Sequence, residues 1–162
     1  MEKFVDEKKI ERIIRQHADM IYQIAFQNVK SKADAEDIFQ DVCLSLITGN
    51  APIDDALHIR NWLIRVTINK CNNFHKSFWN RNSEPLTETL EYFPPEQQEL
   101  LSEIWKLPKN YRNIIYLYYY EGYKIAEIAE LMNLNPNTVS SSLNRARRRL
   151  KIILTEGGFN YG

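Results

Sequence analysis

The stretch Lys124–Leu150, KIAEIAELMNLNPNTVSSSLNRARRRL, decides how this chain of 162 residues is to be understood. Its apolar residues recur at helical spacing on both sides of a break that runs from Asn133 to Pro136. Asparagine tolerates a left-handed backbone, so Asn133 can end the first helix. Asn135 can cap the second helix, with Pro136 at its first helical position. Two helices joined by a tight turn are typical of a helix-turn-helix unit, whose second helix enters the major groove of DNA.

The second helix of this unit carries the candidate DNA contacts. Its polar side chains can hydrogen-bond to bases or phosphates, and its cations can bind phosphates. The candidates are Asn137, Thr138, Ser140, Ser141, Asn144, Arg145, Arg147 and Arg148. An amphipathic helical hairpin with a solvated basic end fits the same pattern, so this stretch alone leaves DNA binding open.

Charge is segregated along the chain, although its 21 basic and 21 acidic residues balance. Residues 56–83 contain basic residues and no acid, residues 84–103 contain glutamates and no base, and residues 145–151 are again basic without an acid. Two basic blocks that flank an acidic block are what a bipartite binder of a polyanion needs, and the neutral average hides them.

The periodicity predicts an all-α fold of two small helical domains, residues 1–79 and 96–154. Residues 80–95 contain prolines and excess acid and are predicted to be a linker, and residues 155–162 a frayed tail. In the first domain we expect helices from about Asp6 to Val29, from a cap at Asp34, and from Asp54 or Asp55 to about Trp79. In the second, a helix from Lys109 to Tyr120 precedes the helix-turn-helix.

Several classes of protein are disfavoured by the sequence. No signal peptide and no apolar run of membrane-spanning length is present, so we expect a cytoplasmic protein with no membrane insertion. The two cysteines, Cys43 and Cys71, lie in apolar helical contexts that favour free thiols. The histidines lack metal-ligand spacing, and no phosphate-binding, nucleophile-elbow or zinc-protease motif occurs. We therefore predict no enzyme, no metal and no cofactor.

An acidic stretch, Asp34–Asp41, offers two interpretations with different chemistry. Asp34, Asp37 and Asp41 share a helix face by spacing and could hold the divalent ions of a nuclease. Acids in a first helical turn also complement the helix dipole without any metal, and no histidine or lysine follows nearby to complete a catalytic site. Leu44, expected to be exposed on the same face, favours a surface that binds a protein partner over a merely solvated face.

The helix that ends near Trp79 combines basic and aromatic residues. Cations bind phosphates, and aromatic rings can stack on unpaired bases. Trp62 shares the apolar stripe and is expected in the core, whereas for Phe78 and Trp79 packing and stacking remain equally open.

Taken together, these segments resemble a bacterial RNA polymerase sigma factor of the extracytoplasmic-function (ECF) subfamily. Residues 34–46, DAEDIFQDVCLSL, are similar to the family's core-binding helix, and residues 60–69, RNWLIRVTIN, resemble its promoter-melting helix. Residues 107–112, LPKNYR, with residues 121–150, resemble the opening and the helix-turn-helix of the fourth conserved region. The resemblance covers nearly the whole chain in the expected order.

This resemblance implies that the chain binds core RNA polymerase and promoter DNA and directs initiation. Asp37, Gln40, Asp41 and Leu44 would face the clamp helices of the large polymerase subunit. Minus-ten DNA would be bound by Arg60, Arg65, Asn69, Asn73 and Lys76, and residues 49–56 would hold an extruded base. The helix-turn-helix would bind the minus-thirty-five element through the eight residues given above. It also implies an anti-sigma factor as a partner, and we expect a monomer when free.

The chain departs from the family pattern at positions that affect DNA binding. Ser140 and Ser142 stand where cations are usual, so readout of guanine by lysine or arginine is not expected there. Asn73 stands where an aspartate is usual, and the basic run after it is thin. We therefore expect weak, shallowly salt-dependent binding of duplex DNA by the free protein and strong reliance on polymerase.

Two other classes of function are to be weighed against the sigma factor. A stand-alone helix-turn-helix regulator would use residues 137–148 equally well, but it has no need of the face formed by Asp37, Gln40 and Asp41. A metal-dependent nuclease would instead need Asp34, Asp37 and Asp41 to hold divalent cations.

Overall fold

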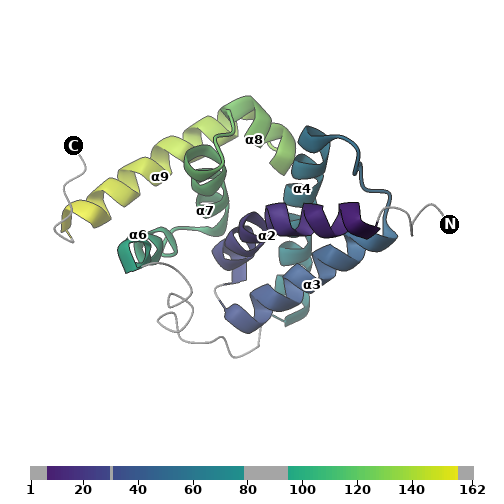
Figure 1. Ribbon diagram of the computed structural model, residues 1–162. Coiled ribbons are helices and arrows are strands. Elements are labelled where there is room, and N and C mark those ends of the chain that lie inside the picture. Colours follow the sequence, from purple (N-terminus) through teal and green to yellow (C-terminus); the bar gives the residue numbers. More distant parts are fainter. Residues whose placement is uncertain (1–6, 30, 79–94, 157–162) are drawn as a thin grey trace. The chain divides into compact units, whose positions relative to one another are not determined.

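The computed structural model describes residues 7–29, 31–78 and 95–156. These residues form helices joined by short connections, and no strand occurs among them, which confirms the all-α prediction (Figure 1). The chain divides into two compact units, residues 1–83 and 84–162. Residues 80–94 of the predicted linker and residues 157–162 of the predicted tail lie outside the described residues. Residue 95 of the predicted linker instead begins a helix, and residues 155 and 156 of the predicted tail still belong to the last described helix.

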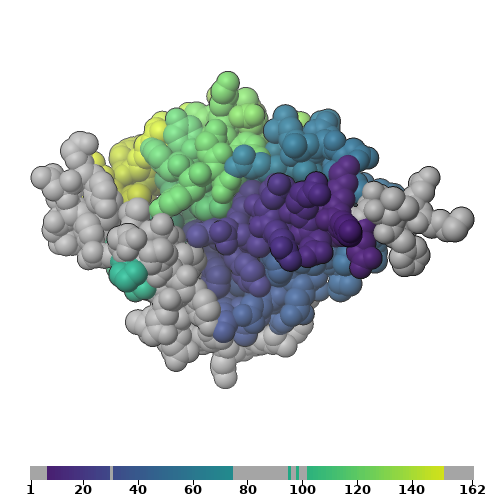
Figure 2. Space-filling view, in the orientation of Figure 1, coloured from purple at the N-terminus to yellow at the C-terminus, as the bar shows by residue number. Residues whose placement is uncertain are grey.

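In the described part of unit 1, the helices α2 (Glu7–Val29), α3 (Lys32–Thr48) and α4 (Ala56–Phe78) pack against one another pairwise. Apolar residues at spacings of three and four bring one stripe of each helix to a common core. The most deeply buried of these are Ile21, Ile24, Ala25, Ala35, Ile38, Val42, Leu63, Ile64 and Cys71. The opposite side of α2 is polar and lies on the surface of the unit (Figure 2).

The cap of α3 corrects the prediction that Asp34 caps this helix. The cap is Ser31, whose Oγ accepts from the Asp34 backbone N–H at 3.4 Å, and the helix begins at Lys32. Asp34 therefore lies inside the first turn, where its side chain is buried. Serine and aspartate are both favourable helix caps. The packing of α3 in the core of unit 1 makes Ser31 the cap rather than Asp34.

The connection from α3 to α4 is fixed at both ends by local chemistry. Gly49 follows α3, and its backbone N–H bonds to the Ser45 carbonyl at 2.8 Å. A Cβ on Gly49 would lie 2.6 Å from that same oxygen, so only glycine fits this close approach. At the other end Asp55 Oδ1 accepts from the backbone N–H groups of Leu57 and His58, each at 3.1 Å. Asp55 is thus the cap of α4, one of the two caps predicted.

Unit 2 consists of α6 (Pro95–Ile104), α7 (Lys109–Ile115), a π-helical turn η1 (Tyr116–Tyr120), α8 (Ile125–Met132) and α9 (Pro136–Glu156). Its core is formed by apolar residues of these elements, among them Trp105, Leu107, Ile114, Leu117, Ile128, Val139, Leu143 and Ala146. The helix predicted from Lys109 to Tyr120 is confirmed, but its second half is π-helical rather than α-helical. There the backbone opens into a π-turn, in which the Glu121 N–H bonds to the Tyr116 carbonyl at 3.2 Å.

The turn between α8 and α9 confirms the predicted helix-turn-helix chemistry. Asn133 has a left-handed backbone, with φ 55° and ψ 49°, and ends α8. Asn135 Oδ1 accepts from the Asn137 backbone N–H at 2.8 Å, and Pro136 is the first residue of α9. Glu127 additionally accepts from the Lys124 N–H at 2.9 Å, which ties down the start of α8.

Candidate polymerase and DNA interfaces

One side of α3 carries the residues expected to contact polymerase. Asp37, Gln40, Asp41 and Leu44 are all exposed, and their spacings of three and four residues place them on one helical face. The Leu44 side chain is 58% exposed, and Ile47, three residues further on, is 50% exposed. The opposite side of α3 is buried in unit 1. The face is therefore acidic with an apolar end, and it is displayed by a helix that the core holds in place.

The three carboxylates considered for a metal site do not all lie on this surface. Asp34 is 8% exposed, whereas Asp37 and Asp41 are exposed. Among the described residues, no group of three or more histidine, cysteine or acidic residues could hold a metal ion. The buried position of Asp34 removes one of the three carboxylates on which the nuclease interpretation depends.

The candidate minus-ten residues lie on α4, but they do not all share a face. Arg65, Asn69 and Asn73 are exposed and follow one another at spacings of four. Lys76 continues this row by its spacing, but its side chain lies outside the described residues. Arg60 is five residues before Arg65, which places it on a different side of the helix, and it is half-buried.

Trp62, expected in the core, is partly exposed beside the α4 row of Arg65, Asn69 and Asn73. Trp62 stands three residues before Arg65 and seven before Asn69, and it is half-buried rather than fully buried. Its ring edge is 3.8 Å from the position that a Cβ on Gly49 would occupy. The α4 face therefore begins with an aromatic ring beside the start of the connecting segment, residues 49–55.

The connecting segment ends at Asp55, whose carboxylate is stabilised in its ionised form by neighbouring hydrogen-bond donors. The backbone N–H of His58 is the main group that lowers the pKa of Asp55, and its imidazole and the Leu57 N–H contribute in the same direction. His58 Nδ1 lies 2.9 Å from Asp55 Oδ2. A second link runs from Lys9 of α2 to Asp54. These contacts hold the start of α4 in an ionised, capped form at neutral pH.

Most of the predicted minus-thirty-five residues lie along one side of α9. Asn137, Ser141, Asn144 and Arg148 are exposed and spaced by three or four residues, and the half-buried Ser140 belongs to the same row. Thr138 and Arg145, seven residues apart, are exposed on the neighbouring side together with Arg149. The opposite side of α9, with Val139, Leu143 and Ala146, is buried.

Arg147 has a defined structural environment that the sequence did not indicate. Its Nε donates to the Tyr119 hydroxyl at 2.6 Å, and its Nη1 lies 3.4 Å from Asn144 Oδ1. No local signal points to this pairing, because 28 positions separate the two residues along the chain.

A second arginine of this unit is structural. Arg112, the last residue of the LPKNYR segment, is buried and donates from Nη1 to the Leu107 carbonyl at 2.5 Å. Burial lowers the pKa of Arg112 to about 10, so it is still protonated at neutral pH. Its role is to fix the connection from α6 to α7.

Two family models match consecutive parts of the chain, one in each unit. "Sigma-70 region 2" matches residues 13–81 and "Sigma-70, region 4" matches residues 97–150. The first range contains α3 and α4 with their candidate surfaces, and the second contains the helix-turn-helix. None of the described helices has the length and apolar character that crossing a membrane requires.

Curated relatives match over nearly the full chain. The RNA polymerase sigma factor SigV of Bacillus subtilis is 28% identical, covering 88% of this chain and 89% of its own length. The ECF RNA polymerase sigma factor SigM of the same species is 26% identical, covering 91% of this chain and 96% of its own length.

Two solved structures share the fold. One is CnrH in complex with the cytosolic domain of CnrY, with a TM-score of 0.66, 22% identity and coverage of 91% of this chain and 88% of the other. The other is the sigma factor RpoE of Bartonella quintana with the anti-sigma factor NepR, with a TM-score of 0.65, 18% identity and coverage of 91% and 98%. With both conserved regions matched in order, and with relatives of the same class along its length, the chain belongs to the sigma-70 family of RNA polymerase sigma factors, in the ECF group.

Proposed function

We propose that this sigma factor divides its work between three helical faces: α3 binds core RNA polymerase, α4 binds the melted minus-ten strand, and α9 binds the minus-thirty-five duplex. As a member of its family the chain is a transcription initiation factor and not an enzyme, with core polymerase and promoter DNA as its partners. One observation supports this assignment of α3, α4 and α9 to three partners. Each face is exposed, and the opposite side of its helix is buried in a core.

The α3 face suits a protein partner better than it suits solvent alone. A solvated helical face has little use for an exposed leucine and isoleucine beside its carboxylates, because exposed apolar groups gain stability only when a partner buries them. Leu44 and Ile47 would supply apolar contact, and Asp37 and Asp41 would select a basic surface. We assign Asp37, Gln40, Asp41 and Leu44 to the clamp helices of the large polymerase subunit.

The α4 face suits single-stranded DNA. Arg65 and Lys76 would bind phosphates, while the amides of Asn69 and Asn73 can donate to and accept from base edges that melting exposes. Trp62 lies at one end of this row, where its partly exposed ring can stack on a base. Residues 49–56, next to Trp62, would receive an extruded base. Arg60, on another side of α4, would reach DNA only at the edge of this surface.

The α9 face suits duplex DNA. Asn137, Ser140, Ser141 and Asn144 present short polar groups near the start of the helix, where a recognition helix approaches bases. Arg147 and Arg148 follow at the positions where phosphate contacts are expected, with Thr138 and Arg145 on the flanking side. Because the reading residues are neutral, we expect modest affinity from this helix alone.

A stand-alone helix-turn-helix regulator is the competing function. It would explain α9 equally well, but it would leave the acidic and apolar face of α3 without a role.

We also propose that the protein is cytoplasmic and monomeric when free, and that an anti-sigma factor controls it. The last proposal is supported by the fold shared with two proteins that were solved in complex with other proteins, one of them a sigma factor bound to an anti-sigma factor.

Assembly with core polymerase tests this function against the alternative. The purified protein is mixed with sigma-free core polymerase of the same bacterium, and complexes are separated by size-exclusion chromatography. A sigma factor comigrates with core, and the assembled complex enriches specific duplexes from a randomised promoter pool. A regulator would enrich duplexes without core and would not comigrate with it.

A further inference from the structure

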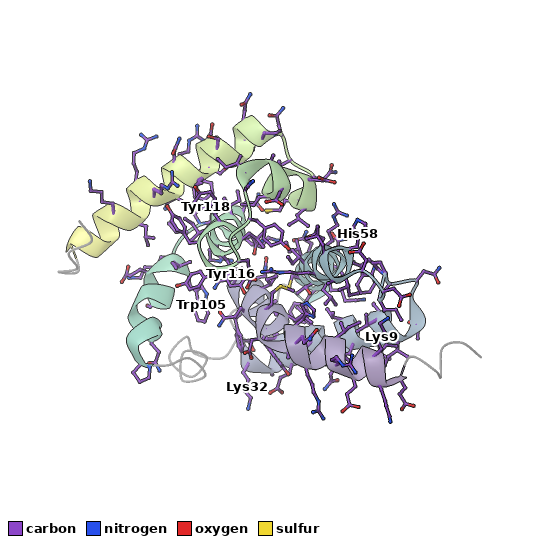
Figure 3. All side chains as sticks on the ribbon, turned by 45° about the horizontal axis from the view of Figure 1, so that its top comes forward. Lys9, Lys32, His58, Trp105, Tyr116 and Tyr118 are labelled. Carbon is purple, nitrogen blue, oxygen red and sulfur yellow. The ribbon has the colours of Figure 1, made fainter. Side chains whose placement is uncertain are left out.

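The π-turn of unit 2 carries a tyrosine cluster that faces α9. Residues 116–120 read YLYYY, and Tyr119 is 54% exposed while Tyr118 is half-buried. The rings of Tyr118 and Tyr119 meet edge to face, with centroids 5.0 Å apart and planes at 75°. A π-turn inside a helix is rare and often marks a functional position. Here it turns two adjacent tyrosines toward one residue of α9. Figure 3 labels the first of them, Tyr118, beside α9.

That residue is Arg147. Its guanidinium carbon lies 5.3 Å from the Tyr118 ring centroid and 5.6 Å from that of Tyr119, within the range of cation–π attraction. Its Nε donates to the Tyr119 hydroxyl oxygen at 2.6 Å. These contacts raise the pKa of Arg147, the Tyr119 hydrogen bond being the largest cause. An exposed arginine is thereby held in one orientation, although its side chain is otherwise among the most flexible.

The chemistry of the Tyr119–Arg147 pair matches a phosphate group. Arginine has only donors, so the Tyr119 oxygen must accept, and the hydroxyl proton can be donated elsewhere. The guanidinium also retains N–H groups beyond those that point to Tyr119, Tyr118 and Asn144. A fixed hydroxyl donor beside a fixed guanidinium offers two hydrogen bonds and one positive charge to the same phosphate.

The pair also lies where a phosphate is expected. Arg147 follows Asn144 by three residues and Ser140 by seven, so it flanks the row of residues assigned to the minus-thirty-five bases. Its Nη1 lies 3.4 Å from Asn144 Oδ1, which joins the pair to that row. Side chains that contact phosphates beside a reading helix fix its register on the duplex.

The other tyrosines of the turn have a structural role and provide a contrast. Tyr116 is buried, its ring stacks on Tyr120 with centroids 5.6 Å apart, and its hydroxyl donates to Glu121 Oε2 at 2.5 Å. Tyr119 and Tyr120 are thus adjacent and both exposed, but the ring of Tyr120 stacks on Tyr116, whereas Tyr119 meets Tyr118 and bonds to Arg147.

We propose that Tyr119 and Arg147 bind one phosphate of the promoter backbone as a single clamp, with Tyr119 as the residue that positions the guanidinium. This inference rests on the proposed assignment of α9 to duplex DNA. It adds a residue outside the helix-turn-helix to the DNA-binding surface and gives the π-turn a function.

The test compares variants of the holoenzyme on a duplex that the wild-type holoenzyme has selected from a randomised pool. Binding is measured between about 50 and 300 mM salt, since the slope of log affinity against log salt counts the cationic phosphate contacts. The variants are Tyr119→Phe, Arg147→Gln, Arg147→Lys and the double variant Tyr119→Phe with Arg147→Gln. Tyr120→Phe is the matched control for the tyrosine, and Lys106→Gln controls for loss of an exposed cation of unit 2 that lies outside α9.

Arg147→Gln should lower affinity and reduce the salt slope by about 1, as expected for one lost phosphate contact. Tyr119→Phe should lower affinity roughly 3- to 10-fold, the range of one hydrogen bond, and leave the slope unchanged because no cation is lost. Arg147→Lys should leave the salt slope unchanged, because the positive charge is retained. It should lower the affinity, because lysine lacks the planar guanidinium and its paired N–H donors. Adding Tyr119→Phe to Arg147→Gln should cost less than about 2-fold, and each control should stay within about 2-fold of wild type.

Three results would overturn the clamp. The first is wild-type affinity in Tyr119→Phe. The second is an equal loss from Tyr119→Phe whether or not Arg147 is present. The third is a loss that is matched by Tyr120→Phe, which would indicate a packing effect. A wild-type protein that forms no promoter-selecting holoenzyme would instead contradict the proposed function itself, and the clamp with it.

Discussion

Arg112 donates a hydrogen bond from Nη1 to the carbonyl oxygen of Leu107 across the connection between α6 and α7, at 2.5 Å inside unit 2. The arginine is 6% exposed, and burial lowers its pKa to about 10. A buried, protonated arginine stabilises a fold through its bonds and its packed stem rather than through contact with DNA. Arg112 therefore differs in role from the exposed arginines of α9.

Arg112→Ala should destabilise the protein by at least about 2 kcal/mol, because it removes a charged donor from a buried carbonyl and leaves a void. Chemical denaturation followed by circular dichroism measures this loss. Lys106→Ala is the matched control, since the Lys106 side chain is exposed, pairs with Glu103 at 3.2 Å, and should change stability by less than about 0.5 kcal/mol when removed. Equal stability of the two variants would contradict the structural role.

The α3 face should be separable from the stability of unit 1. Gln40→Ala combined with Asp41→Ala, or Leu44→Ala alone, removes exposed side chains and should leave the melting temperature within a few degrees of wild type. Affinity for core polymerase, measured by fluorescence titration, should fall about 10-fold or more for the double variant. Asp19→Ala on α2 removes an exposed acid elsewhere in the same unit and should leave affinity unchanged. If the α3 variants bind core as tightly as wild type does, this face is not the docking surface.

The α4 face should affect melted DNA and not duplex DNA. Asn69→Ala with Asn73→Ala removes two base-contacting amides, so holoenzyme affinity for a single-stranded minus-ten oligonucleotide should fall about 10-fold. Affinity for a duplex that contains only the minus-thirty-five element should stay the same. Arg60→Ala, on another side of the helix, should have the smaller effect. A larger loss from Arg60→Ala than from the asparagine pair would mean that the assignment of the α4 face is wrong.

The cap of α9 allows stability and DNA binding to be separated at one residue. Asn135→Ala removes the acceptor for the Asn137 N–H and should cost about 0.5–2 kcal/mol of stability. Asn135→Asp keeps a capping acceptor and complements the helix dipole, so stability should be retained. The new negative charge beside the duplex should nevertheless weaken promoter binding by the holoenzyme. Thermal melting and promoter binding, measured on both variants, check the two effects, and full promoter affinity in Asn135→Asp would place this helix end away from DNA.

Residues that read bases and residues that bind phosphates should differ in specificity. Arg147→Ala should weaken binding about evenly across promoter sequences, because phosphates carry no base information. Asn144→Ala should relax the preference at one or two base pairs, each by about 1–3 kcal/mol. Repeating the promoter selection with each variant holoenzyme measures both effects. A changed sequence preference in Arg147→Ala would mean that this arginine contacts bases.

The elements that local chemistry determines could be predicted from the sequence. The break between α8 and α9 follows from two asparagines and a proline whose backbone preferences act within a few residues, and Asp55 caps α4 for the same reason. The α3 cap could not be chosen in this way, since Ser31 and Asp34 are both good caps and the packing of α3 decides between them. The exposed face of α3 was predictable because spacing alone separates Leu44 from the buried Val42 and Leu46.

The features that depend on contacts distant in sequence could not be predicted. A run of tyrosines carries no local signal for a π-turn, and the bond from Arg147 to Tyr119 joins residues 28 positions apart. Arg112 and Arg147 look alike in the sequence as cations near helix ends, yet one is buried and the other exposed. Only the packing of unit 2 separates the structural arginine from the candidate DNA contact.

The central claim is that this chain joins core polymerase and confers promoter specificity. Multiple-template run-off transcription tests it most directly, with sigma-free core polymerase of the same bacterium and a pool of promoters from its genome. We predict transcripts of defined start sites that require the protein and are lost with the Gln40→Ala and Asp41→Ala double variant. If the wild-type protein starts no transcript from any template, or if the double variant starts them as efficiently, the account is contradicted.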